Sequence, residues 1–97
     1  MSQTIRYIHI REVCDFHQVE IQTIERLLDV GVVRADYRDD GPYVAEPEIN
    51  RLETAIRIHR DLHVNPEGID VILQLRQRME ALQVRMREME VRLRRYE

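Results

Sequence analysis

The chain has 97 residues, 43% of them apolar, and a formal net charge of −3. This length allows one small domain plus an extension. Residues 1–50 carry ten acidic residues and five arginines, a net charge of −5, whereas residues 51–97 carry eight acidic residues and ten arginines, a net charge of +2. DNA affinity comes largely from cations that neutralise phosphates. The acidic first half therefore argues against nucleic-acid binding and favours a basic protein partner.

Cysteine content and hydropathy bear on the location of the protein. No apolar run approaches the roughly 20 residues of a membrane span, and residues 1–6 lack the apolar core of a signal peptide. The chain has one cysteine, which excludes an intrachain disulfide and fits a reducing compartment. We therefore expect a soluble cytoplasmic protein that contacts no membrane.

The first third of the chain predicts a helix-turn-helix. Residues 4–8 alternate weakly and predict a short strand. Apolar residues at helical spacing predict helices over about 10–16 and 20–30, joined by a tight turn at His17 and Gln18. Gly31 follows the second helix, where glycine takes the left-handed conformation without penalty.

The next residues predict a β-hairpin wing and a third helix. Residues 36–43 are polar and contain Asp40, Gly41 and Pro42, which are turn formers. Pro47 then predicts the start of a helix over about 48–63. The apolar side chains expected on the buried side of this helix are Ile49, Leu52, Ile56 and Leu62.

A fourth helix is predicted from Asn65 to the end of the chain. Asn65 would cap this helix and Pro66 would take its first position. Its apolar residues follow alternating spacings of three and four, which is the heptad of a coiled coil. The predicted seam is about 36 Å long and consists of Ile72, Leu75, Met79, Leu82, Met86, Met89, Leu93 and Tyr96.

This seam predicts a homodimer. A narrow apolar stripe on a long helix needs a second helix to cover it. Its three methionines would also suit an adaptable binding groove, but at seam positions we interpret them as a soft dimer contact. We therefore divide the chain into a winged helix-turn-helix domain over residues 1–65 and a dimerisation helix over residues 66–97.

The charges beside the seam leave the helix orientation open. With Ile72 as position a, the three g positions 78, 85 and 92 are arginine, and the e positions 90 and 97 are glutamate. A parallel pair would place Arg85 against Glu90 and Arg92 against Glu97, whereas an antiparallel pair would bring arginines together. Surface ion pairs contribute little to stability, so both orientations remain.

The order of these elements resembles that of MerR-like winged-helix proteins. Three segments resemble one branch more closely, the CbpM chaperone modulators. They are Ile-Arg-Glu-Val-Cys at residues 10–14, Val-Gly-Val-Val at residues 30–33, and residues 57–65, Arg-Ile-His-Arg-Asp-Leu-His-Val-Asn, followed by Gly68 and Ile69. The resemblance covers about residues 5–85. It implies a mainly α fold, a MerR-like winged helix-turn-helix with a small β-hairpin wing and a long C-terminal coiled-coil helix.

The resemblance also implies a function. CbpM-like proteins are dimeric adaptors that bind the J-domain of a DnaJ-like co-chaperone of the CbpA type and inhibit it, which modulates the activity of a DnaK-type chaperone. MerR-like proteins are more often DNA-binding transcriptional regulators, which stays as the alternative. MerR-like dimers usually pair their helices antiparallel, in disagreement with the charges beside the seam.

The second helix separates the two functions. MerR-type DNA binders usually carry an Arg-Tyr-Tyr-type cluster there, but residues 23–28 of this chain read Thr-Ile-Glu-Arg-Leu-Leu. The helix has a net charge of −2, which would repel phosphates in a major groove. J-domains generally present a basic helix, so we predict partner contacts through the acidic residues of the first two helices. These are Glu12, Asp15, Glu20, Glu25 and Asp29. The simpler interpretation is that these are solvated surface acids.

The remaining candidate motifs predict no chemistry. His59 and His63 have a spacing that can bind a metal, but no cysteine or following glutamate joins them. We interpret them as partly buried structural histidines and expect no metal and no cofactor. Cys14 shares a face with Ile10 and Val13 and is interpreted as a buried apolar residue. Since no nucleophile, base and oxyanion site are arranged together, we expect no enzyme.

Overall fold

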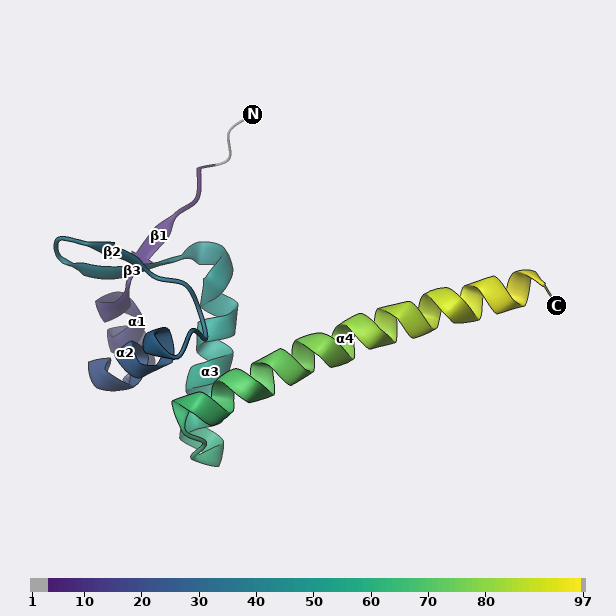
Figure 1. Cartoon of the computed structure of the whole chain (residues 1–97). Coiled ribbons are helices and arrows are strands. Elements are labelled where there is room, and N and C mark those ends of the chain that lie inside the picture. The colour runs from purple at the N-terminus through teal and green to yellow at the C-terminus, as the bar shows by residue number, and fades with distance from the viewer. Residues whose placement is uncertain (1–3, 97) are drawn as a thin grey trace.

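The computed structural model describes residues 4–96, and its elements follow the predicted order (Figure 1). Strand β1 (Tyr7–His9) leads into α1 (Ile10–His17) and α2 (Ile21–Asp29). The hairpin of β2 (Asp36–Arg38) and β3 (Gly41–Ala45) follows, then a 3-10 turn η1 (Glu46–Glu48), α3 (Ile49–Leu62) and α4 (Pro66–Arg95). The predicted fold class, a winged helix-turn-helix with a long C-terminal helix, is confirmed. Residues 1–3 and the heptad position Glu97 lie outside the described residues.

The small sheet holds the wing against the helix-turn-helix. Its strand order is β1-β3-β2, and both pairings are antiparallel, with Tyr7 opposite Ala45 and Asp36 opposite Tyr43. The strand predicted over residues 4–8 was placed too early, because β3 ends at Ala45 and pairs only from Tyr7 onward. Residue 6 still contributes one bond, from the Glu46 N–H to the Arg6 carbonyl at 2.8 Å.

One apolar core joins all the helices. Its buried side chains come from α1 and α2, from the loop after α2, from β3, from α3 and from the first turns of α4. They are Ile10, Val13, Cys14, Ile24, Leu27, Leu28, Val32, Val33, Val44, Leu52, Ala55, Ile56, Ile69 and Leu73. Within residues 4–96, no polar or charged side chain is buried. The apolar side chains of the domain thus point into the core, and the charged side chains lie at the surface.

Residues with positive φ end the short helices. Gly31 has φ +88°, and the Val32 N–H reaches the Leu27 carbonyl while the Gly31 N–H reaches the Leu28 carbonyl, each at 3.1 Å. This pair of hydrogen bonds is a Schellman motif, which confirms the predicted role of Gly31 as the residue that ends the helix. Gln18 takes φ 52° after α1, which turns the chain between the two helices of the motif.

The third helix corrects three predictions. Pro47 lies in the preceding 3-10 turn η1 rather than at the start of α3. Leu62, predicted to be buried, is 67% exposed, because α3 ends there. His63 was predicted to be partly buried, but it is exposed and takes φ 54° as the residue that closes the helix. The range predicted for the helix, about 48–63, nevertheless agrees with α3 to within one residue at each end.

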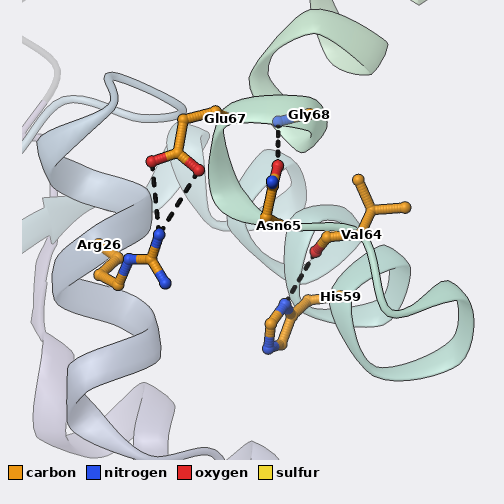
Figure 2. A network of polar contacts seen from close by, with 6 residues as sticks. All are labelled: Arg26, His59, Val64, Asn65, Glu67 and Gly68. Carbon is orange, nitrogen blue, oxygen red and sulfur yellow. Dashed lines mark hydrogen bonds and ion pairs between the residues drawn. The ribbon is translucent and has the colours of Figure 1, made fainter.

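The fourth helix starts at the predicted cap and leaves the domain. The Asn65 side-chain oxygen accepts a hydrogen bond from the Gly68 N–H at 2.7 Å, and Pro66 occupies the first turn (Figure 2). The helix has 30 residues, so it is about 45 Å long. Its buried residues are Pro66, Ile69 and Leu73, and the rest projects away from the domain (Figure 1). No described helix is long and apolar enough to cross a membrane.

Candidate partner-binding face

The exposed side of the helix-turn-helix is acidic. Glu12 and Asp15 lie on α1, Glu20 caps the start of α2, and Glu25 and Asp29 lie on α2; all five side chains are exposed. Within residues 4–96, none of the five forms an ion pair. The carboxylates predicted to contact a partner are therefore accessible and are not engaged in ion pairs within the described residues.

The five carboxylates differ in the ionisable groups that they influence. Asp15 and Glu25 both act on Cys14: burial chiefly raises the pKa of the Cys14 thiol, and these two charges raise it further. The pKa of Tyr43 is raised chiefly by its hydrogen bond to Asp40, and the charge of Glu12 adds to this. Glu20 and Asp29 stand nine positions apart, about 13 Å along the helix. Asp15 on α1 and Glu25 on α2 thus both influence the same thiol, that of Cys14.

The one arginine of α2 is held by the fold. Its guanidinium donates to both carboxylate oxygens of Glu67, at 3.4 and 3.5 Å, across from the first turn of α4 (Figure 2). Both side chains are 59% exposed, so the pair contributes little stability. In the structure the Arg26 guanidinium is nevertheless directed at α4. The exposed face of α2 is left with Gln22, Glu25 and Asp29.

The wing arginine is also engaged within the fold. The Arg38 side chain donates to the Asp36 carboxylate at 3.1 Å, and its guanidinium lies 4.3 Å from the Tyr43 ring centroid and 4.9 Å from that of Tyr7. The Tyr43 hydroxyl donates to the Asp40 carboxylate at 2.6 Å. This bond lowers the pKa of Asp40 and raises the pKa of Tyr43. The wing therefore presents carboxylates beside a cation that already has partners.

Two arginines of α3 donate hydrogen bonds to backbone carbonyls at the ends of α1 and α2. The Arg51 side chain donates to the Val32 carbonyl after α2. The Arg60 side chain donates to the carbonyls of His17 and Gln18, which end α1. Cations at the carboxyl end of a helix satisfy its last carbonyls and its dipole. Much of the arginine content near the motif thus supports the fold.

The predicted seam of α4 is accessible in the single chain. Ile72 is half-buried against the domain, whereas the other seven seam residues are between 51% and 89% exposed. A stripe of this size on a projecting helix is more apolar surface than a monomer usually leaves in water. The structure shows the stripe, and its dimer partner stays a prediction.

The histidines and the cysteine have structural environments. The His59 ring nitrogen Nδ1 donates to the Val64 carbonyl at 3.0 Å, which ties the end of α3 to the loop before α4 (Figure 2). No group of three or more metal-ligating side chains occurs among the described residues. Cys14 is buried, as predicted.

Sequence reasoning missed Phe16, Glu53 and Glu67. Phe16 is 82% exposed, although its spacing from Val13 resembles that of a core residue. Glu53 pairs with His17 at 2.9 Å and Glu67 pairs with Arg26 at 3.4 Å. Both pairs join segments about 40 positions apart, so no local signal in the sequence could reveal them.

A winged helix-turn-helix followed by a long projecting helix defines a class of small regulatory modules. The family model described as MerR HTH family regulatory protein matches residues 8–91, and the chain belongs to this family. Neither the curated proteins nor the solved structures gave a match.

Proposed function

We propose that this protein is a dimeric adaptor that binds the J-domain of a DnaJ-like co-chaperone of the CbpA type. Binding would inhibit the co-chaperone and so modulate a DnaK-type chaperone. The observation that carries the proposal is the exposed face of α2, which presents Glu25 and Asp29 while its arginine is bound to Glu67. The choice of a J-domain as partner comes from the resemblance of residues 10–14, 30–33 and 57–65 to CbpM proteins.

The negative charge of this face favours one of the two candidate partners. A helix that enters a major groove needs donors for phosphates and base edges. The α2 face offers carboxylates instead, and the wing adds Asp39 and Asp40 next to an engaged Arg38. The same carboxylates attract a basic protein helix, with favourable charge pairs and faster association. The geometry thus supports a protein partner over a duplex.

The proposed adaptor acts as a homodimer through α4. Covering the seven exposed seam residues removes apolar surface from water, which stabilises association by about 25 cal/mol per Å² before entropic costs. A dimer presents two helix-turn-helix faces, so one adaptor can engage two co-chaperone subunits.

The test is a titration of the full-length protein against the host's J-domain. In Glu20→Arg/Glu25→Arg, attractive contacts become like-charge contacts, so the binding free energy should weaken by more than about 1 kcal/mol. Binding of the unmodified protein should also weaken as salt rises to about 0.5 M, where the Debye length is roughly 4 Å. Isothermal calorimetry measures both effects.

The matched control is Glu80→Arg/Glu88→Arg, which makes the same charge change on exposed positions of α4 outside the seam. This control should bind as tightly as the unmodified protein. Equal binding by Glu20→Arg/Glu25→Arg would refute the acidic face as the contact. If Arg57→Glu, on the exposed side of α3, then abolished binding, the partner would stand and the site would move to α3.

A further inference from the structure

An apolar groove lies where β1, α1 and α3 meet, on the side of α1 that carries Glu12. Its volume is about 340 Å³ and its apolar lining is Ile8, Val13, Phe16 and Ile49. Val13 is buried, and Ile8 and Ile49 are half-buried. Phe16 is 82% exposed and forms one wall. The groove is thus a shallow apolar depression with an aromatic side chain standing beside it.

The polar lining of the groove consists of two carboxylates and the His17 ring. Glu12 lines it from α1 and Glu53 from α3. The Glu53 carboxylate lies 2.9 Å from the His17 ring nitrogen Nε2, which fixes it at the rim. Glu12 and Phe16 are four positions apart and share one helical face, and Asp15 is exposed beside them. No lysine or arginine lines the groove.

We propose that this groove is the anchor point for a basic helix of a partner protein, which inserts one apolar side chain beside Phe16 while flanking arginines or lysines reach Glu12 and Glu53. The charge of the rim selects a cationic partner, and the apolar floor selects a side chain that loses water on binding. An exposed aromatic next to a pocket is the kind of residue that carries a large share of interface energy.

This inference rests on the proposed function and makes it more specific. It moves the centre of the binding face from α2 to α1, because Glu12 and Phe16 belong to the groove whereas Glu20 and Asp29 lie at the two ends of α2. The α2 carboxylates then act as a rim that attracts the partner, and the groove supplies the short-range contact. Long-range attraction is sensitive to salt and apolar contact is not.

The experiment compares Phe16→Ala with the matched controls Tyr37→Ala and Leu62→Ala, which remove side chains each 67% exposed on the wing and at the end of α3. Each full-length protein, labelled with ¹⁵N, is titrated with the host's J-domain. It is also titrated with a synthetic helical peptide that has one central leucine and four arginines. Phe16→Ala should weaken J-domain binding about tenfold at both low and high salt, and the controls should change it less than twofold. Amide signals of residues 8, 16 and 49 should move with either ligand.

The outcomes separate the two proposals. If the J-domain binds Phe16→Ala and the unmodified protein equally, the groove is not the anchor and the adaptor function stands. If the J-domain fails to bind but the peptide moves the groove signals, the groove stands and the J-domain is the wrong partner. If neither ligand binds, both proposals fail. If Phe16→Ala lost the mass of the dimer in solution, a second copy of the chain would fill the groove, which also overturns the inference.

Discussion

At the scale of single residues, one pair of side chains in the wing shifts each other's pKa. The Tyr43 hydroxyl donates to the Asp40 carboxylate at 2.6 Å, which lowers the pKa of Asp40 and raises that of Tyr43. The Asp40 carbonyl also accepts from the His9 ring, while the other His9 nitrogen accepts from the Arg11 N–H and caps α1. The wing tip is thereby joined to the start of the helix-turn-helix.

The pH dependence of this pair has a defined sign. Because the folded pKa of Asp40 is lowered, its contribution to stability is present above the unfolded pKa of about 3.9 and is lost as pH falls through the folded value. The raised pKa of Tyr43 contributes below the unfolded value of about 10 and is lost as pH rises through the folded value.

Tyr43→Phe should raise the pKa of the Asp40 carboxyl toward its ordinary range, because the hydroxyl donor is its largest cause of lowering. The loss of stability should be greatest between pH 4 and 9, where both groups contribute, since acid and alkali weaken the pair in the unmodified protein. A carboxyl NMR titration checks the pKa of Asp40, with Tyr37→Phe, at an exposed position of β2, as control. An unchanged Asp40 titration in Tyr43→Phe would contradict the assignment.

At the scale of elements, α4 uses two faces for two tasks. Pro66, Ile69 and Leu73 face the domain core, whereas the seam begins at Ile72 and Leu75 on a side turned by roughly 100°. The domain contact ends within the first turns, and the seam takes over beyond it. Val84 and Val91 lie opposite the seam and are 47% and 50% exposed, which provides a natural comparison between the faces.

Leu82→Glu/Met86→Glu should give monomers, because dimerisation would bury two carboxylates in an apolar seam. Val84→Glu/Val91→Glu introduces the same charges on the opposite face and should leave the dimer intact. Light scattering at tens of micromolar measures the mass of each protein. The homodimer would be disproved by an unmodified protein that is already monomeric under these conditions.

The elements also show how far sequence reasoning reaches. Gly31 and Asn65 were predicted as helix-ending and helix-starting residues, because their effects are local, and the structure confirms both. Periodicity placed the end of α3 within one residue, but it did not reveal that the Leu62 side chain is exposed or that His63 turns the backbone. The acidic residues of the first two helices could be proposed from charge alone. The groove beside Phe16 could not, because it requires α3 to pack beside β1 and α1.

At the scale of the whole molecule, the domain and the projecting part of α4 differ in charge. The compact part of the chain carries most of the acidic residues, and the projecting part of α4 carries many of the arginines. The Cα extents are 60 × 42 × 20 Å, so these regions are well separated compared with a Debye length of about 8 Å. A partner that approaches the domain meets an acidic surface on its own.

The full-length protein should show no sequence-specific binding to duplex DNA at about 0.15 M salt, because the α2 face lacks cations for phosphate contact. A gel shift with competitor DNA tests this. Tight binding that resists competitor would reverse the order of the two functions and would indicate the arginines of α3 and α4 as the contact surface. In that case the affinity should fall steeply with salt.

The contact between Arg26 and Glu67 has a consequence for any measurement at varied ionic strength. It is an exposed ion pair between α2 and the first turn of α4. Salt screens this pair over the same range of ionic strength that weakens attraction to the partner. A salt titration therefore reports two changes at once, the loss of attraction to the partner and the loss of the contact between Arg26 and Glu67. In Glu67→Gln the ion pair is already absent, so repeating the titration with this variant isolates the loss of attraction to the partner. The difference between the two curves then measures how much the contact between Arg26 and Glu67 contributes to the salt dependence of partner binding.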